Sequence, residues 1–481
     1  MSVINKETDL DQMIELKSTP KLGNGNMSRS VAPLDTYQRI LPLMPAAGLS
    51  HVVDVTSLDI LGIPIFVGFG SDKVDKQLSN FVDWAPRPFR EKVEYALANA
   101  DRFTSQAPSK GSKPVFVAGK GPTNLEAKVS AMMEAIERFS ARYPSCQPVV
   151  GSYSTMLKRG DIDVLDPRAL ILISPDAFDA DQELEWVLGT ELGTGKEVWV
   201  PADAATLSYQ PSLASRVCSD TPTGLGAGNT MEEAVSHGLA EAIEHDSWTL
   251  AVVRNSFSSA QNGLLDILFG KTIESQPASL ALEKTKETSF IRLDLDSIAH
   301  IQPVAELISQ IRKAGIQLNV YVVTSDIEIP TFSVSVAGFA EGQDGGGLGA
   351  HPDARVAFSR AVTEAAQQRI IMHARSFFPQ AQLIARWQPI FGEQANAAPG
   401  EAACRFSDVT SFSASDILDD IHYMLDTLAS QGLNQVIVVD LTKPEFNIPV
   451  VKVIVPGLAD YWTSSTVPDW RALGSRVRRY I

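Results

Sequence analysis

The chain has 481 residues, 44% of them apolar, and a formal net charge of −16 at pH 7. This length and apolar content can bury a large core, either as one large domain with appendages or as two to three domains. The negative charge argues against binding to nucleic acid or to anionic membranes, and no stretch approaches the ~20 continuous apolar residues of a membrane span.

The chain opens with a polar segment, and residues 1–30 predict a flexible N-terminal arm. Residues 17–30 are rich in Gly, Asn, Ser and Lys, a composition that does not build a packed core. The start of the chain lacks the apolar stretch of a signal peptide. The cysteines at positions 146, 218 and 404 are far apart and form no CxxC pair. Together these features predict a cytoplasmic protein.

Residues 31–110 predict an N-terminal segment about the size of one small domain. Tyr37, Ile40 and Met44 have the spacing of a short helix. Residues 51–55 and 63–69 are rich in β-branched and aromatic side chains and predict strands. Residues 87–100 form an amphipathic stretch that predicts a helix.

The central feature of the sequence is an internal duplication. Residues 119–140 and 226–247 align without a gap at a constant offset of 107 residues. Each copy has a Gly-x-Gly-x-Thr segment, a Glu-Ala pair and then a Glu-Ala-Ile-Glu run. The strand predicted at residues 114–118 leads into the first copy, which leaves Lys120 at the mouth of the following helix, where phosphate groups often bind.

Each copy predicts a helix that begins with a capping box. Thr123 with Glu126, and Thr230 with Glu233, have the spacing of an N-cap residue and its reciprocal partner. Within each helix two glutamates stand three residues apart, which places them on one face, about 5–6 Å apart at their β-carbons.

One such glutamate pair is typical of a solvated helix face. Two gap-free copies instead favour a site where four carboxylates meet across a pseudo-twofold axis. Hard oxygen ligands of this kind suit magnesium better than zinc.

Strand and helix signals alternate through the rest of the chain and predict an α/β or α+β fold with pseudo-twofold repeats. Residues 341–349 contain too many glycines for regular structure. They predict a ligand-binding loop before a helix at 355–369. On that helix Arg360 could hold phosphate, with a surface salt-bridge face as the alternative. The other predictions are strands at 184–189, 197–201, 290–293, 318–323 and 435–440, helices at 304–315 and 417–428, and an exposed insertion at 388–412.

Four motifs resemble those of the YcaO family, and together they span roughly residues 110–460. Ser130-x-x-x-Glu134-x-x-Glu137-Arg138 resembles the first nucleotide-binding motif of that family, and Gly228-Asn229-Thr230-x-x-Glu233 with Glu241-x-x-Glu244 resembles the second. A third lies in Gly349-Ala350-His351-Pro352-Asp353 and the run from Arg360 to Arg369. The fourth is Val439-Asp440-Leu441-Thr442, followed by residues 449–457. The resemblance implies a YcaO-like catalytic domain over residues 111–460, with 461–481 as a C-terminal tail.

The resemblance also implies ATP-dependent chemistry on a peptide or protein substrate. YcaO enzymes phosphorylate a backbone amide oxygen, which turns a poor leaving group into a good one. By carry-over, magnesium would be held by Glu134, Glu137, Glu241 and Glu244. ATP contacts would come from Lys120, Ser130, Arg138, Asn229, Glu233, His237, Gln367 and Arg369. The sequence identifies no general base.

The attacking nucleophile decides the product. External sulfide would give a thioamide, whereas a Cys, Ser or Thr side chain of the substrate would give an azoline ring. The chain ends without the proline-rich terminus of azoline-forming members, and residues 128–134 are most similar to the thioamide-forming group that works with a TfuA partner. We therefore expect thioamide formation with a TfuA-like partner protein. An azoline-forming cyclodehydratase and a non-catalytic nucleotide-binding scaffold are the alternatives, and the sequence leaves a homo-oligomer open.

Overall fold

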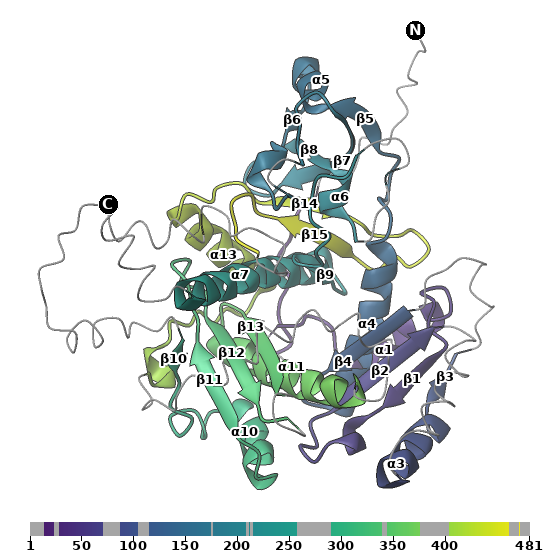
Figure 1. Ribbon diagram of the computed structural model, residues 1–481, viewed down its shortest axis with the longest axis vertical. Helices are drawn as coiled ribbons and strands as arrows, with labels where there is room; N and C mark the ends of the chain where they lie inside the picture. Colours follow the sequence, from purple (N-terminus) through teal and green to yellow (C-terminus); the bar gives the residue numbers. More distant parts are fainter. Residues whose placement is uncertain are drawn as a thin grey trace, which may run out of the picture.

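The computed structural model describes residues 14–23, 28–70, 87–103, 115–174, 177–207, 211, 215–256, 290–338, 344–375, 404–460 and 471. Within these ranges the chain folds into three sheets and the helices that pack on them, which confirms the mixed α+β prediction. Figure 1 shows the long helix α7 (Met231–Ser256) crossing the middle of the molecule, with α4 (Asn124–Ser140) to its right and α11 (Ala354–Arg375) below it.

The first sheet is antiparallel in the order β3-β1-β2-β4. Its strands are β1 (His51–Asp54), β2 (Ile65–Gly70), β3 (Asp101–Arg102) and β4 (Val115–Lys120). The same part of the chain contains the helices α1 (Pro33–Ile40) and α3 (Arg87–Ala98) and the 3-10 turns η1 (Leu41–Leu43) and η2 (Thr56–Leu58). The helix and strand predictions here are confirmed. Because β4 pairs with β2 across the boundary predicted at residue 110, the two predicted segments share one sheet.

The second sheet is antiparallel in the order β10-β11-β12-β13. Its strands are β10 (Ile291–Arg292), β11 (Leu318–Val322), β12 (Thr331–Val336) and β13 (Gly345–Ala350), with the helix α10 (Val304–Lys313) between β10 and β11. The strands and helix predicted between residues 290 and 323 are therefore confirmed. The insertion predicted at 388–412 falls outside the described residues up to position 403.

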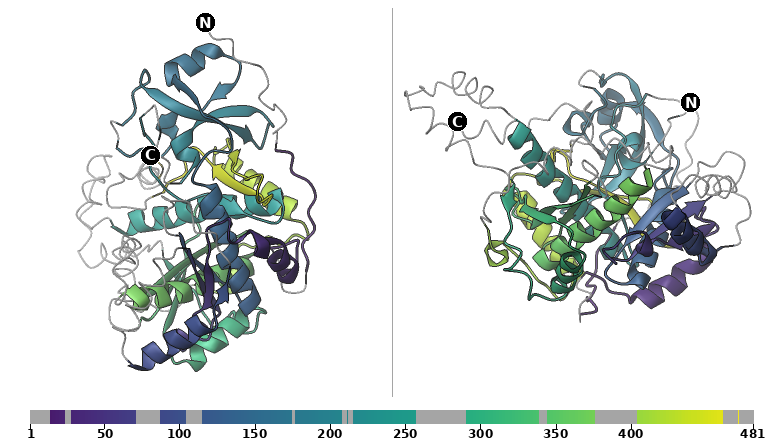
Figure 2. Two further views of the ribbon diagram at one scale, coloured as in Figure 1. Left: turned by 90° about the vertical axis from the view of Figure 1, so that its right-hand side faces the viewer. Right: turned by 60° about the horizontal axis from the view of Figure 1, so that its bottom comes forward.

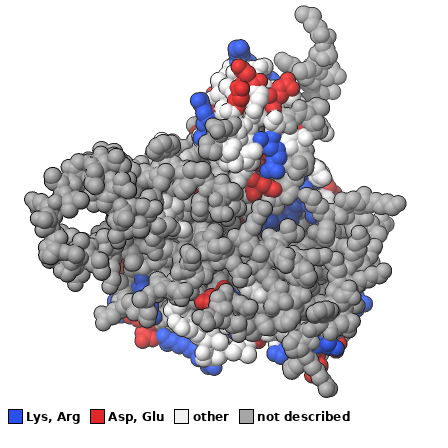
Figure 3. All heavy atoms as spheres, viewed as in Figure 1, with Lys and Arg blue, Asp and Glu red and all other residues white. Residues whose placement is uncertain are grey.

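The third sheet has the order β6-β8-β7-β14-β15-β9, and β5 pairs with β7 beside this path. Its strands are β5 (Val149–Ser152), β6 (Asp163–Val164), β7 (Glu183–Glu191), β8 (Glu197–Pro201), β9 (Leu225–Ala227), β14 (Ile437–Asp440) and β15 (Val450–Ile454). The helices of this part are α5 (Tyr153–Arg159), α6 (Ala202–Ala205) and α13 (Ile417–Ser430). Figure 2 shows β5 to β8 as a lobe that projects from the rest of the molecule. On the face drawn in Figure 3, described acidic and basic side chains stand next to one another on this lobe.

The two predicted copies are confirmed as the strand–helix units β4–α4 and β9–α7. Thr123 caps α4 by accepting from the Glu126 amide, and Thr230 accepts from the Glu233 amide in the same way. The unit β13–α11 adds a third repeat that the sequence did not predict. Contrary to the prediction of a loop, the glycine-rich segment at 345–350 is a strand paired with β12 along its whole length.

Glycines let each helix lie directly on the backbone of its own strand. A β-carbon at Gly119 would stand 2.1 Å from the Ala127 carbonyl oxygen, and one at Gly226 would stand 2.2 Å from that of Ala234. On β13, alternate glycines point at α11, and a β-carbon at Gly347 would lie 2.2 Å from the Ala361 oxygen. The glycine-rich segment β13 is a strand because each of its residues pairs with β12, and its alternate glycines allow α11 to pack directly on its backbone.

The three helices form a ring in which each also touches the strand of the next unit. Helix α4 packs on β4 and contacts β9, α7 packs on β9 and contacts β13, and α11 packs on β13 and contacts β4. The buried apolar clusters follow this order. One joins α4 to the first and third sheets, a second joins α11 to the first and second, and a third joins α7 to α13 and the third sheet. We call α4, α7 and α11 the helix ring.

The N-terminal arm differs from its prediction wherever it is described, because it is bound to the rest of the chain. Pro20 forms a bridge with Asp416, and the Thr19 amide donates to the Asp416 carboxylate at 2.8 Å. Further along, Ser30 donates its backbone N–H and its hydroxyl to Glu233 at 2.7 and 2.8 Å. The composition of the arm gave no sign of these partners. No helix in the described ranges is long and apolar enough to cross a membrane.

The close packing of β13 on α11 predicts a large cost for one methyl group. Gly347→Ala places a β-carbon against helix backbone that cannot move aside, so we expect a loss of roughly 1–3 kcal/mol in the free energy of unfolding. Denaturant unfolding of the purified protein measures this loss. Gly193→Ala is the matched control, because nothing lies within 4 Å of a β-carbon at Gly193. Equal stability of both variants would contradict this account of the packing.

Candidate functional site

The three helices of the ring carry matching polar residues at matching positions. Glu134, Glu241 and Glu364 each lie ten residues after the first residue of their helix, and Glu137, Glu244 and Gln367 each lie thirteen after it. Glu364 was missed in the sequence because the third unit lacks the Glu-Ala-Ile-Glu run. Aligning the units by their helix starts would have found it. We call the five glutamates the glutamate ring.

Backbone groups of the strands hold these side chains in place around the ring. Glu137 accepts a hydrogen bond from the backbone of Ala227 on β9. Glu244 accepts one from the amide of Ala350 on β13 at 2.8 Å, and Gln367 donates to the carbonyl of Ala118 on β4. The amide of Ala118 also donates to Glu134 at 3.0 Å. Each helix thus fixes one of its polar side chains on the strand of the next unit, which brings the two predicted glutamate pairs into one site.

Three carboxylates of this site are not fully neutralised by the positive groups around them. Burial, together with the neighbouring Glu137 and Glu244, raises the pKa of Glu241 to about 8, against the lowering effects of His245 and Lys452. Burial likewise raises the pKa values of Glu137 and Glu244 to about 7. Even so, the Glu241 side chain keeps 26% of its accessible surface. Carboxylates that are largely removed from water, but still partly accessible, are suited to binding a cation.

Positive groups face the glutamate ring from three segments. The pKa of His237 is held well below its usual range, first by burial and then by the charges of Arg360, Arg29 and Lys120. Positive side chains that lie close together repel one another unless an anion binds beside them. The convergence of these three side chains therefore indicates an anion site. Arg29 was missed because the arm appeared to be unstructured. We call Arg29, Lys120 and Arg360 the cation cluster.

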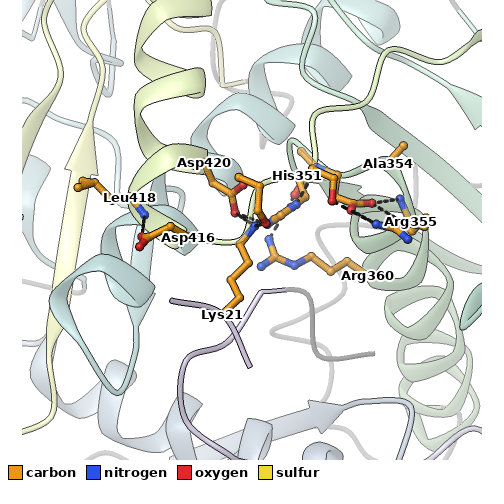
Figure 4. Close-up of polar contacts among 12 residues, drawn as sticks. Lys21, His351, Ala354, Arg355, Arg360, Asp416, Leu418 and Asp420 are labelled. Atoms are coloured by element: carbon orange, nitrogen blue, oxygen red, sulfur yellow. Dashed lines mark hydrogen bonds and ion pairs between the residues drawn. The ribbon is translucent and has the colours of Figure 1, made fainter. Parts of the chain in front are cut away.

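Figure 4 shows how the N-terminal arm is anchored beside this cluster. Lys21 pairs with the buried carboxylate of Asp420 at 2.6 Å, and His351 lies 3.5 Å from the same oxygen. Arg360 donates to the carbonyl of Ala350 at 3.2 Å. Arg29, further along the arm, lies 3.6 Å from Glu233 at the start of α7. The arm therefore contributes one member of the cation cluster and is held by a buried ion pair.

Other predicted nucleotide contacts also lie around the ring. Ser130 accepts from the Lys120 amide at 3.4 Å, and Arg138 pairs with Glu134 at 3.2 Å. The Lys120 ammonium pairs with Glu364. Glu233 accepts from the Asn229 amide at 3.0 Å, so in this structure it caps α7 as well as binding Ser30.

Among the predicted nucleotide contacts, three buried polar atoms have no hydrogen-bond partner within the described residues: Nδ1 of His237, Oδ1 of Asn229 and Nε of Arg138. Buried polar groups are normally hydrogen-bonded, so unpaired ones at an anion site are consistent with a ligand that supplies the partners.

Arg369 does not lie with the other predicted contacts. Its guanidinium pairs with Asp59 at 2.8 Å and donates to the carbonyl of Ala337, and the side chain is buried. Two residues along a helix correspond to about 200°, so Arg369 points to the side of α11 opposite Gln367. In this structure Arg369 ties α11 to the loop that holds Asp59.

The described residues contain no ready-made cluster of three His, Cys, Asp or Glu ligands for a metal. Magnesium does not need one, because it keeps several waters and is usually bound by one or two carboxylates together with phosphate oxygens. Paired glutamates beside a cation cluster supply both halves of such an arrangement. The residues therefore fit a magnesium ion that binds together with a phosphorylated ligand.

Buried glutamates beside a cluster of positive side chains are the arrangement expected of an enzyme that uses magnesium and a nucleotide. More particularly, this chain belongs to the YcaO family. The family model described as "YcaO cyclodehydratase", with ATP and Mg²⁺ binding, matches residues 118–459. The chain is thus an ATP-dependent enzyme of that family, and ATP and Mg²⁺ are its cofactors.

Similar proteins occur in archaea and bacteria. An uncharacterized protein of Methanothermobacter thermautotrophicus is 29% identical, and the match covers 94% of this chain and 99% of that protein. An uncharacterized protein in the tfuA 3′ region of Rhizobium leguminosarum bv. trifolii is 26% identical over 94% of this chain and 93% of its own length.

Two solved structures share the fold at 21% identity. YcaO from Methanopyrus kandleri, bound with AMPPCP and Mg²⁺, matches with a TM-score of 0.59 over 92% of this chain and 95% of that one. A heterocyclase in complex with substrate and cofactor matches with a TM-score of 0.69 over 97% of this chain, which spans only 57% of the heterocyclase.

The raised pKa values predict that the metal-free protein loses stability as the pH rises. In the unfolded chain the glutamates release protons near their ordinary pKa of 4.5, whereas in the folded protein Glu137, Glu241 and Glu244 hold them up to about 7 to 8. The folded state binds more protons over this window, so the free energy of unfolding declines with rising pH.

Glu241→Gln removes one of these groups. We expect it to raise the free energy of unfolding near pH 8 by something on the order of 1 kcal/mol, with little change near pH 5. Denaturant unfolding in the presence of a chelator measures both values. Glu183→Gln, at an exposed position of β7, serves as the control. The same pH dependence in wild type and Glu241→Gln would refute the prediction.

Proposed function

We propose that this enzyme converts a peptide backbone amide into a thioamide, using ATP to activate the amide oxygen and sulfide as the nucleophile. The juxtaposition of the glutamate ring with the cation cluster supports the phosphoryl-transfer part of this proposal. The near full-length similarity to a protein in a tfuA region supports the sulfide part.

The reaction balances without a redox partner. Hydrosulfide adds to the carbonyl carbon, and the electron pair of the C=O double bond moves to oxygen. That oxygen attacks the γ-phosphorus of ATP, and the bond to ADP breaks. The C–O bond then breaks with release of phosphate, a proton is lost from sulfur, and a C=S group remains. Each turnover consumes one ATP and one hydrosulfide and releases ADP and phosphate.

In this proposal the described residues have two roles: the acidic residues bind the metal ion, and the basic residues bind the phosphates. Glu134, Glu137, Glu241 and Glu244 would hold magnesium, which would offset charge as the phosphoryl group moves. Lys120, Arg29 and Arg360 neutralise the phosphate oxygens from the other side. His237 and Asn229 use their unpaired atoms for the nucleotide.

Lys120 and Glu364 pair with each other in the ligand-free protein. We propose that ATP separates them, which lets Lys120 turn to phosphate and frees Glu364 to join the metal side. Catalysis then rests on positioning and charge stabilisation, with no protein group forming a covalent bond to the substrate.

The peptide substrate reaches this site with a TfuA-like partner, by extension from the tfuA-region relative. The second candidate is an azoline-forming cyclodehydratase, which the description of the family favours. It uses the same phosphorylation and differs only in taking a side chain of the substrate as nucleophile. A non-catalytic scaffold is disfavoured because all five glutamates and the cation cluster are present together.

Calorimetric titration with magnesium and a non-hydrolysable ATP analogue tests the assigned site. We expect wild type to bind, and Glu134→Gln, Glu241→Gln and Glu364→Gln each to lose at least about tenfold in magnesium-dependent affinity, equivalent to about 1.4 kcal/mol. Glu183→Gln should bind as wild type does. The site assignment is wrong if the ring variants keep wild-type affinity.

Transfer of radiolabelled sulfide tests the reaction. Protein extract from a deletion strain supplies unmodified substrate, to which the purified enzyme, magnesium, ATP and labelled sulfide are added, together with a TfuA-like protein where one is encoded nearby. We expect ATP-dependent incorporation of label that Glu241→Gln abolishes. Mass analysis of the modified peptide then distinguishes the products: exchange of oxygen for sulfur indicates a thioamide, whereas loss of water without incorporated label indicates an azoline and overturns the sulfide assignment.

A further inference from the structure

His245 follows directly after Glu244 on α7, and its buried imidazole lies between two carboxylates. Its Nε2 is 3.9 Å from Oε1 of Glu241, one helical turn earlier. Its Nδ1 is 3.6 Å from Oδ1 of Asp460, which follows β15. Both are ion-pair distances, and they place the ring where it touches a predicted magnesium ligand on one side and a second carboxylate on the other.

The first repeat has the same arrangement with a different cation. Arg138 occupies the equivalent position on α4 and pairs with Glu134 at 3.2 Å, again four residues apart. In both units, a cationic or ionisable side chain thus braces the first glutamate of the pair. In the second unit a further carboxylate, that of Asp460, lies on the other side of the bracing side chain.

Asp460 is itself fixed by its surroundings. Its Oδ2 accepts from the Thr221 hydroxyl at 3.0 Å, and its side chain is only 7% exposed. The preceding residue, Ala459, donates its backbone N–H to Asp246 at 2.9 Å. Asp246 is the neighbour of His245 on α7, so the segment that carries Asp460 is attached to the helix next to the residue it contacts.

Arg471 strengthens this attachment. Its guanidinium binds both oxygens of the buried Asp246 at 2.6 and 2.8 Å, and Asp326 at 2.7 Å. Bidentate arginine–carboxylate pairs of this kind have a defined geometry as well as a favourable energy. Two neighbouring residues of α7, His245 and Asp246, therefore each bind the C-terminal part of the chain.

We propose that His245 and Asp460 are positioning residues that orient Glu241 for magnesium, and that His245 makes no contact with the nucleotide. This inference rests on the assignment of Glu241 as a magnesium ligand. A carboxylate ligand can rotate about its side-chain bonds, and a fixed partner on one oxygen limits that rotation and directs the other oxygen at the metal. Residues that orient metal ligands in this way typically contribute 10–100-fold to metal affinity.

A double-mutant cycle separates positioning from direct nucleotide contact. Magnesium titrations at saturating non-hydrolysable ATP analogue are compared for wild type, His245→Gln, Glu241→Gln and the double variant. If His245 acts through Glu241, its substitution weakens magnesium binding by about 10–100-fold in the wild-type background and has no further effect once Glu241 is replaced. Additive effects of the two substitutions would mean that His245 contacts the ligand independently, and the proposal would fail.

Asp460→Asn is expected to reproduce the effect of His245→Gln in the same titration while the melting temperature stays near that of wild type. Asp296→Asn removes an exposed carboxylate that pairs with Arg312 and is the control. Should Asp460→Asn prove unstable, Thr221→Val removes only the hydroxyl that holds Asp460, and a smaller shift in the same direction is expected. Magnesium affinity unchanged in a folded Asp460 or Thr221 variant overturns the proposal. Failure of wild type to bind the magnesium–analogue complex would instead count against the proposed function itself.

Discussion

The direct contact between helix backbone and strand backbone is the constraint on which the rest of this structure depends. Wherever a glycine of β4, β9 or β13 faces its helix, no side chain separates the two elements. The helices therefore lie low on their strands, which brings Glu137, Glu244 and Gln367 within reach of the backbone of the neighbouring unit. With ordinary side chains at these positions the helices would stand further away, and those interactions would be lost.

The charge arrangement of the site follows from the same geometry. Three repeats bring five glutamates together, and their mutual proximity and burial raise the pKa values of at least three of them. Such an arrangement destabilises the ligand-free protein. It persists in a folded chain because large apolar clusters surround the helix ring and outweigh the cost. The candidate site thus lowers the stability of the protein, as is common for binding sites.

Much of this could be predicted from local patterns. The two copies, their threonine caps and the pairing of glutamates on one face all depend on short-range spacing, and the structure confirms them. Composition misled in two places. Glycine weakens an isolated strand, but all six residues of β13 are buried and paired with β12. The polar arm has partners about 200 to 400 residues away that no local pattern reveals. Arg369 was assigned by resemblance alone, although its position two residues from Gln367 already placed it on another face of the helix.

The docked N-terminal arm has a consequence for how the protein is made. The arm is synthesised about 400 residues before the Asp416 and Asp420 carboxylates that hold it. Contacts between such distant parts of a chain form late, because a long loop must close before they contribute any energy. The segment before Arg29 can therefore dock fully only after α13 has been made, so these contacts are among the last to form.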